Sequence, residues 1–263
     1  DGRLATWDPP YLERIDGAWL LGHRSEKELQ ALFDEMDRLP GVRRVHQEQG
    51  RIWRRGLGPA REPFGFVDGI AVQRFFSGRP PLDTALDQVF CQDELHGGTF
   101  LVLRKLEQNV RLFRECQAQL ERTRGPDEAR RLVEGLVGRR ESGTPLTQHR
   151  GPNGFDFADD PAGRRCPFHA HIRRSNPRAV RNDGGPALRL VRRGVVFGAD
   201  DALNDTAGAA GGVGLLFLAY MHSLDTFRTM QGNWLAYAHF QMSVITTPQV
   251  LFIYVIQLYL VIF

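Results

Sequence analysis

Strand-like and helix-like patterns of apolar residues alternate along this chain of 263 residues. Gly17–Gly22 is a short apolar run between glycines, which is typical of a strand, and Gly41–Gln49 reads as another strand. Between them, Ser25–Leu39 places apolar residues at helical spacing behind a serine cap, with Glu28 completing a capping box. Strand, helix and strand make half of a ferredoxin-like α+β unit, so the pattern predicts an α+β fold.

The second part of the chain repeats this order of elements. Strands are predicted at the start of Gly97–Asn109, in Leu188–Gly198 and in Gly212–Met221, and helices in Val110–Gln119, Asp127–Leu136 and Ser223–Leu235. A long segment rich in Gly, Pro and Asp, Gly143–Gly163, is predicted as a loop, and loops of this length are usually functional or disordered. We therefore expect two packed α+β lobes.

Composition and charge exclude some classes of function. The net charge of +3 is too small to indicate a nucleic-acid partner. Arginines far outnumber lysines, which suits the binding of carboxylates or phosphates. The three cysteines are too few for a disulfide framework and favour a reducing compartment. A cytoplasmic location is therefore favoured, with a secreted or periplasmic protein as the alternative because the native N-terminus is not visible.

The two ends of the chain are unusual. The start, "DGRLATWDPP", has neither Met nor a signal-peptide pattern and reads as the middle of a longer protein or as a processed form. Val250–Phe263 is nearly all apolar but shorter than a membrane span, and its β-branched and aromatic residues predict a buried strand. A membrane or partner contact and a damaged terminus are the alternatives.

Cys166–Arg178, "CPFHAHIRRSNPR", concentrates groups that bind ligands. His169 and His171 would share one metal ion if they lay on a strand, but would diverge on a helix. Cys166 and His169 have half of a zinc-type spacing, and no second cysteine pair follows. The other interpretation is a single ligating histidine among arginines, beside the apolar "GLLFL" run, which fits a haem with its two propionates.

A second motif, "GFVDGI", places Asp68 between two glycines. Most Asp-Gly pairs are simply turns. If this carboxylate faced the open side of a haem, it would be able to carry a proton between the two oxygens of bound peroxide. The residues alone leave both interpretations open.

Together these motifs resemble the dye-decolorising peroxidases. The segments "FGFVDGI", "GGTFLVLRKLEQNV", "LVGRRESGTPL", "NGFDFADDPAGRRCPFHAHIRRSNPR", "LRLVRRGVVFG" and "GLLFLAY" occur in the order seen in that family, from about Ile15 to Trp234. The combination is specific, although the Asp-Gly element alone is weak. The resemblance implies two ferredoxin-like lobes, the first truncated at its N-terminus: residues 1–75, ending in the GFVDG element, and a haem-binding lobe of residues 76–263.

The resemblance also implies the site. Asp68 and Arg192 would be catalytic residues on the distal side of a haem b. His171, rather than His169, would be the proximal iron ligand. Arg178 would contact a propionate, and Leu215 and Phe217 would form the apolar distal wall.

The implied activity is a peroxidase that reduces H2O2 through a ferryl intermediate and oxidises dyes or phenolic and aromatic substrates. Its partners would be H2O2 and a small reducing substrate, with neither nucleic acid nor membrane, and a homodimer is possible. Candidate surface electron relays are Trp53, Trp234 and Tyr220, and the alternative for each is a plain packing role. The alternative is a protein that handles haem or iron without efficient turnover. The sequence departs from the family at its shortened start, at His169, where Gly or Ala is common, at Arg140 and in its apolar end.

Overall fold

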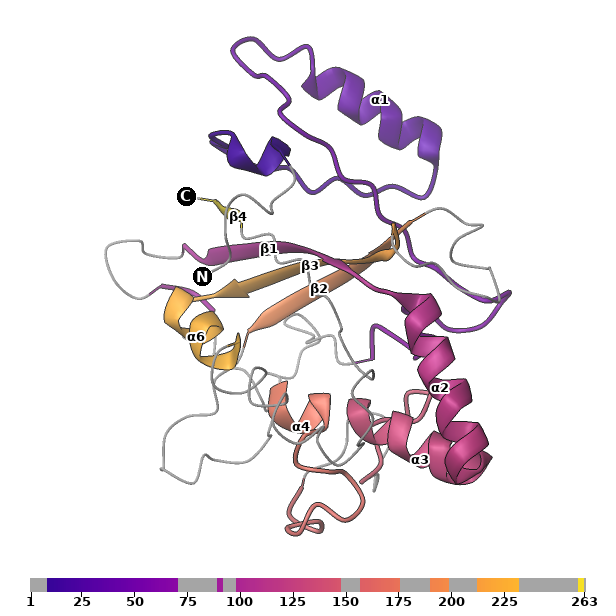
Figure 1. Ribbon diagram of the computed structural model, residues 1–263. Coiled ribbons are helices and arrows are strands. Elements are labelled where there is room, and N and C mark those ends of the chain that lie inside the picture. Colours follow the sequence, from indigo (N-terminus) through magenta and orange to yellow (C-terminus); the bar gives the residue numbers. More distant parts are fainter. Residues whose placement is uncertain are drawn as a thin grey trace.

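The computed structural model describes residues 9–70, 89–91, 98–147, 157–175, 190–198 and 212–231, and the backbone of 260–262. The fold is α+β, as predicted, with one small antiparallel sheet between helices (Figure 1). Helix α1 (Glu26–Met36) lies on one side of the sheet, and α2 (Val110–Arg124), α3 (Pro126–Val137) and α4 (His171–Ser175) lie on the other. None of the described helices is long and apolar enough to cross a bilayer.

The sheet has the strand order β2-β3-β1-β4. Three strands confirm sequence predictions: β1 (Phe100–Glu107), β2 (Val191–Phe197) and β3 (Gly214–Met221). The central strand β3 has the mostly buried pattern expected of a strand flanked on both sides. Three residues of the apolar C-terminal run form β4 (Leu260–Ile262), which pairs with β1, and the rest of that run lies outside the described residues.

One face of the sheet is directed toward α2 and α6 (Leu224–Thr229). Residues opposite each other in an antiparallel pair share a face, and Arg192 is opposite Ala219 while Gly194 is opposite Phe217. Two apolar clusters pack on this face; one contains Trp53, Val110, Val196 and Val213, and the other contains Val102, Ala219, Met221 and Phe227. The predicted distal residues on β2 and β3 therefore extend from one packed surface.

Capping residues in the sequence mark the start of α2 and the end of α3. The Asn109 side chain accepts from Leu112 N at 2.9 Å at the start of α2. Helix α3 ends at Gly138, which has a φ of 87°. A Cβ at Gly138 would lie 2.5 Å from Ile172 Cγ1, so only glycine lets the start of α4 approach this closely.

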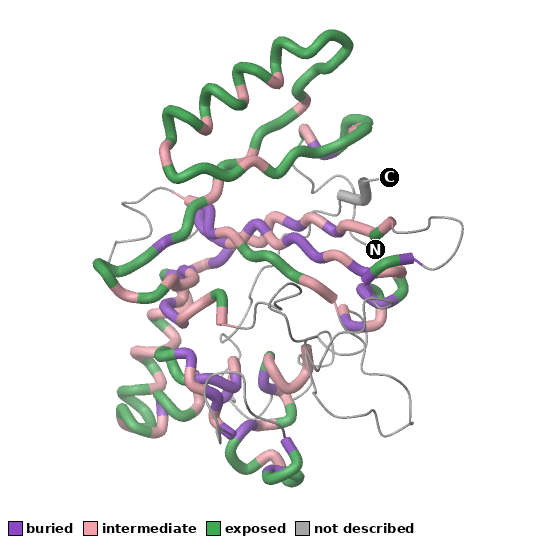
Figure 2. Tube along the Cα trace, turned by 180° about the vertical axis from the view of Figure 1, so that it is seen from behind, coloured by how far each residue is buried: buried purple, intermediate pink, exposed green. Residues whose placement is uncertain are grey.

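The N-terminal segment departs from the prediction. Helix α1 is confirmed, with the Ser25 hydroxyl accepting from Glu28 N at 3.4 Å. The strands predicted at Gly17–Gly22 and Gly41–Gln49 are wrong, because neither segment pairs with another strand in the described part. Trp19 and Leu20 are 56% and 63% exposed, and Figure 2 shows that α1 and its surroundings are almost entirely accessible. Strand-forming residues do not make a strand without a partner.

Candidate functional site

The loop that carries Asp68 is fixed by backbone hydrogen bonds. Asp68 N donates to Ala60 O at 2.9 Å, and Val67 N donates to Glu141 O at 3.1 Å. Gly65 has a φ of 108° and Gly69 one of 75°, so the turns on both sides of Asp68 use conformations that favour glycine. The backbone of the predicted motif is therefore held on both sides, while the Asp68 side chain forms no hydrogen bond with the residues that the structure describes.

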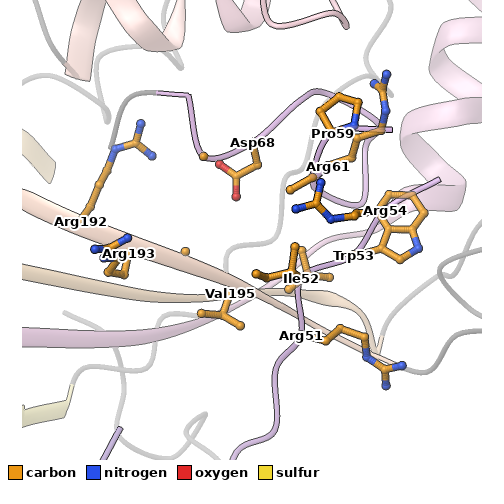
Figure 3. Close-up of a pocket in the computed structure, with 14 residues that line it drawn as sticks. Arg51, Ile52, Trp53, Arg54, Pro59, Arg61, Asp68, Arg192, Arg193 and Val195 are labelled. Carbon is orange, nitrogen blue, oxygen red and sulfur yellow. The ribbon is translucent and has the colours of Figure 1, made fainter. Parts of the chain in front are cut away.

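Asp68 lines a cavity of about 400 Å³ between its loop and the edge strand β2. Arg192 and Arg193 lie on one side of its carboxylate, and Arg54 and Arg61 lie on the other (Figure 3). A Cβ at Gly194 would lie 3.7 Å from Asp68 Oδ2, so the missing side chain of this glycine leaves room for the carboxylate above the sheet.

Some of the charged side chains in this cavity form hydrogen bonds and others do not. Arg54 donates to Gly58 O at 3.0 Å, and Arg61 donates to the carbonyl groups of Gly65 and Glu141. Within the described part of the chain, the side chains of Asp68 and Arg192 form no hydrogen bond or ion pair. Charged groups that face a cavity without partners are the arrangement expected of a binding or catalytic site.

His171 is the first residue of α4. By its accessible surface the residue is exposed, yet enough protein atoms surround the imidazole that burial, followed by the charge of Arg192, lowers its pKa to about 4. The influence of Arg192 on this pKa shows that the two side chains lie near each other. The imidazole is neutral at neutral pH and forms no hydrogen bond with the described residues, so its lone pair is available to a metal.

The loop before His171 is organised around Asp160. This buried carboxylate accepts from the backbone N–H groups of Arg164, Arg165 and Cys166 at 2.8, 3.2 and 2.9 Å. It also pairs with Arg173 at 3.1 Å, and the Arg173 guanidinium lies over the rings of Phe157 and Phe168. Burial raises the pKa of Asp160, but the backbone donors and Arg173 outweigh it, so the pKa lies below its ordinary value.

Replacing Asp160 with Asn is expected to lower the free energy of unfolding by about 2 kcal/mol at pH 7, because a charged acceptor of several N–H groups is lost. A carboxyl with a lowered pKa stabilises the fold above its ordinary pKa, and this contribution is lost as the pH falls through the lowered value. Urea unfolding at pH 7 and pH 3 measures both effects. Asp127→Asn, in an exposed ion pair with Arg130, is the control; an equal loss there would contradict the prediction.

The zinc alternative has little support in the described part of the chain. His169 lies in the turn before α4, so His169 and His171 do not share the face of a strand. Burial raises the pKa of the Cys166 thiol to about 11, so this cysteine remains protonated. Among the described residues, no group of three or more His, Cys, Asp or Glu side chains is placed to hold a metal ion.

Comparison with known proteins identifies the family. The model described as "Dyp-type peroxidase, C-terminal" matches residues 59–243, which is more than half of the chain. The chain belongs to the dye-decolorising peroxidase family. The "Multifunctional dye peroxidase DyP2" of Amycolatopsis sp. is 33% identical over 89% of this chain and 59% of its own length. The solved structure of DyP2 has a TM-score of 0.72, with 88% of this chain and 58% of that chain covered at 32% identity.

Two further structures of dye-decolorising peroxidases support this assignment. A DyP-type peroxidase from Anabaena sp. is 28% identical with a TM-score of 0.72, over 89% of this chain and 58% of that chain. A dye-decolorizing peroxidase in complex with 2,6-dimethoxyphenol is 26% identical with a TM-score of 0.60, over 81% of this chain and 57% of that chain. The chain therefore spans somewhat more than half the length of these relatives.

The other residues predicted for the site have different surroundings. Leu215 and Phe217 are half-buried on the same face of β3 and pack against the two apolar clusters. Arg178 and Trp234 lie outside the described residues. Trp53 is buried in an apolar cluster, and Tyr220 is half-buried.

Sequence reasoning missed Glu62 and the role of Asp160. Both carboxylates bind backbone N–H groups of their own loops, at 2.9–3.0 Å for Glu62. Contacts of this kind have no characteristic residue spacing. The signal in the sequence was an acidic residue just before the FGFVDGI motif for Glu62, and one inside the motif that contains Cys166 for Asp160.

Proposed function

We propose that this chain contains the haem site of a peroxidase that reduces H2O2 and oxidises dyes or phenolic and aromatic compounds. The observation that carries the proposal is that Asp68 and Arg192 line one cavity without a hydrogen bond or ion pair to other described residues, and that Arg192 lies near a neutral His171. The relatives described above are peroxidases by name, which favours a peroxidase over the haem-handling alternative. The dimethoxyphenol complex of one relative supports phenols as the reducing substrates.

The described residues fit a haem, for which we propose haem b. His171 would hold the iron through its neutral imidazole. Arg174 is three residues further along α4, and its Nε is buried without a hydrogen-bond partner among the described residues. A buried guanidinium nitrogen without an acceptor suits an acidic group such as a propionate. Arg178 is proposed for a second such contact.

The proposed chemistry assigns a role to each residue. When bound, haem would supply the electrons that reduce peroxide, and the reducing substrate would return these electrons to it. The Asp68 carboxylate takes the proton from one peroxide oxygen and delivers it to the oxygen that leaves as water. Arg192 stabilises the negative charge that develops during this transfer. The side chains of Leu215 and Phe217 exclude water from the distal side, which strengthens both interactions.

We also propose the larger organisation implied by the family. Residues 1–75 would belong to an N-terminal ferredoxin-like lobe, and residues 76–263 to the C-terminal ferredoxin-like lobe that holds the haem. The proposed partners are H2O2 and a small reducing molecule. A homodimer is proposed as the assembly.

The test is an absorption spectrum of the protein after addition of haemin, before and after one equivalent of H2O2. We expect a Soret band that requires the folded protein, followed by a spectral change within seconds and recovery when 2,6-dimethoxyphenol is added. A stable Soret band without a response to peroxide would favour haem handling instead. Absence of any band would reject the haem site.

A further inference from the structure

A second carboxylate, which has no role in the chemistry above, lies behind the Asp68 loop. Glu62 directs both of its oxygens at N–H groups: Oε1 accepts from Phe66 N at 2.9 Å, and Oε2 accepts from Phe64 N at 3.0 Å. Its own backbone closes the same turn, because Glu62 N donates to Phe66 O at 3.0 Å and Gly65 N donates to Glu62 O at 2.8 Å. The turn that precedes Asp68 is therefore built around one side chain.

Gln108 ties this turn to the core of the fold. It lies between β1 and α2, is 7% exposed, and donates from Nε2 to Glu62 Oε2 at 2.8 Å. Its backbone N–H donates to Val213 O at 2.8 Å, which fixes the residue against the start of β3. Glu62 is thus connected both to the turn and to the sheet.

The Gln108 amide is held in one orientation. Its Oε1 is buried and has no hydrogen-bond partner among the described residues. An unmatched buried acceptor costs about 1–3 kcal/mol. Turning the amide over would place this oxygen against the Glu62 carboxylate, where two acceptors would repel each other. The observed orientation is therefore more stable, although it leaves Oε1 without a donor among the described residues.

We propose that Glu62 is a positioning residue that sets the place of Asp68 in the cavity through the turn 62–66, with Gln108 as its anchor. Asp68 follows this turn by two residues and has no side-chain partner of its own among the described residues. The place of its carboxylate therefore depends on the backbone before it. The peroxide part of the inference rests on the proposed function, but the effect on the turn does not.

Three charged side chains face this turn. Asp68 lies beyond it, Arg61 donates to Gly65 O, and Arg114 Nη2 of α2 is 3.2 Å from the position of a Cβ at Gly65. Burial is the largest influence on Glu62 and raises its pKa; the three N–H donors oppose this rise, and the charge of Asp68 adds to it. The ionisation of Glu62 is therefore coupled to the distal loop.

The first test uses the protein without haem and compares Glu62→Gln with the parent chain. A glutamine cannot accept from all three donors, so amide hydrogen exchange at Phe64 and Phe66 is expected to accelerate about fivefold or more. The matched control is Glu48→Gln: Glu48 accepts from Tyr11 and binds Lys105 elsewhere in the fold. Unchanged exchange at both phenylalanines in Glu62→Gln would overturn the inference.

The pH dependence of unfolding gives a readout that a loss of packing alone would not move. Because the pKa of Glu62 is raised in the folded state, its proton stabilises the fold at low pH, and this contribution is lost as the pH rises above the ordinary value of 4.5 through the raised value. Glu62→Gln should remove this decline and Glu48→Gln should retain it. The same decline in Glu62→Gln as in the parent chain would count against the assignment.

The second test uses the haem-loaded protein and separates the effect of side-chain length at position 62 from the effect of its charge. Glu62→Asp keeps the charge but is one methylene shorter, so it cannot hold both amides. We expect Glu62→Gln and Glu62→Asp each to slow the reaction with H2O2 about 10- to 100-fold, with the KM for the phenol unchanged. Parent-like rates in Glu62→Asp would refute positioning. If the haem-loaded parent chain did not react with H2O2, the proposed function would be rejected. The hydrogen-exchange results would still test the role of Glu62 in holding the turn.

Discussion

His171→Ala is expected to fold normally and to lose the ability to retain haem. The loss should reach at least about 100-fold in affinity, because disturbing only the partner of a metal-binding histidine already costs 10- to 100-fold. The side chain has no hydrogen bond with the described residues whose loss would destabilise the fold. Haemin titration followed by the Soret band measures the affinity, and urea unfolding of the haem-free protein measures the stability.

His169→Ala is the matched control, since it removes the same group two residues earlier. It should bind haem within about threefold of the parent chain. Because the pKa of His171 is lowered to about 4, the parent chain should also keep its affinity between pH 7 and pH 5, where an ordinary histidine becomes charged. Retention of haem by His171→Ala with loss in His169→Ala would reverse the ligand assignment.

The elements predicted correctly are those whose determinants are local. Helix α2 has its cap at Asn109, α3 ends at Gly138, and β3 is a continuous apolar run. The strands predicted at Gly17–Gly22 and Gly41–Gln49 failed because pairing depends on a partner elsewhere in the chain. The sequence shows strand propensity, but it does not show whether a neighbouring strand is present.

The same distinction applies to the site. Asp68, His171 and Arg192 were predicted because each lies in a recognisable motif, and the structure places Asp68 and Arg192 on one cavity. Glu62 and Asp160 were not predicted, since their partners are backbone N–H groups whose positions exist only after folding. Motifs therefore identified the groups proposed for the chemistry, but they did not identify Glu62 and Asp160, which hold the neighbouring loops in place.

Asp68→Asn is expected to leave haem binding intact and to slow the reaction with H2O2 by about 10²- to 10⁴-fold, the range for loss of a general acid–base group. Asparagine keeps the shape of the side chain, and the backbone hydrogen bond from residue 68 to Ala60 remains.

Arg192→Leu should slow the same step by about 10²- to 10³-fold, because a donor to developing negative charge is lost. Stopped-flow absorbance after mixing with H2O2 measures both rates.

Arg193→Leu is the control for charge, because it removes a neighbouring guanidinium from the same strand. Arg193 is opposite Leu218 in the register, whereas Arg192 is opposite Ala219, so the two arginines extend from opposite faces of β2. Only Arg192 shares its face with Gly194 and the Asp68 carboxylate. Its replacement should therefore affect the peroxide step far more than that of Arg193. Equal losses in the two variants would mean that the overall positive charge of the cavity, rather than the position of Arg192, accelerates the reaction.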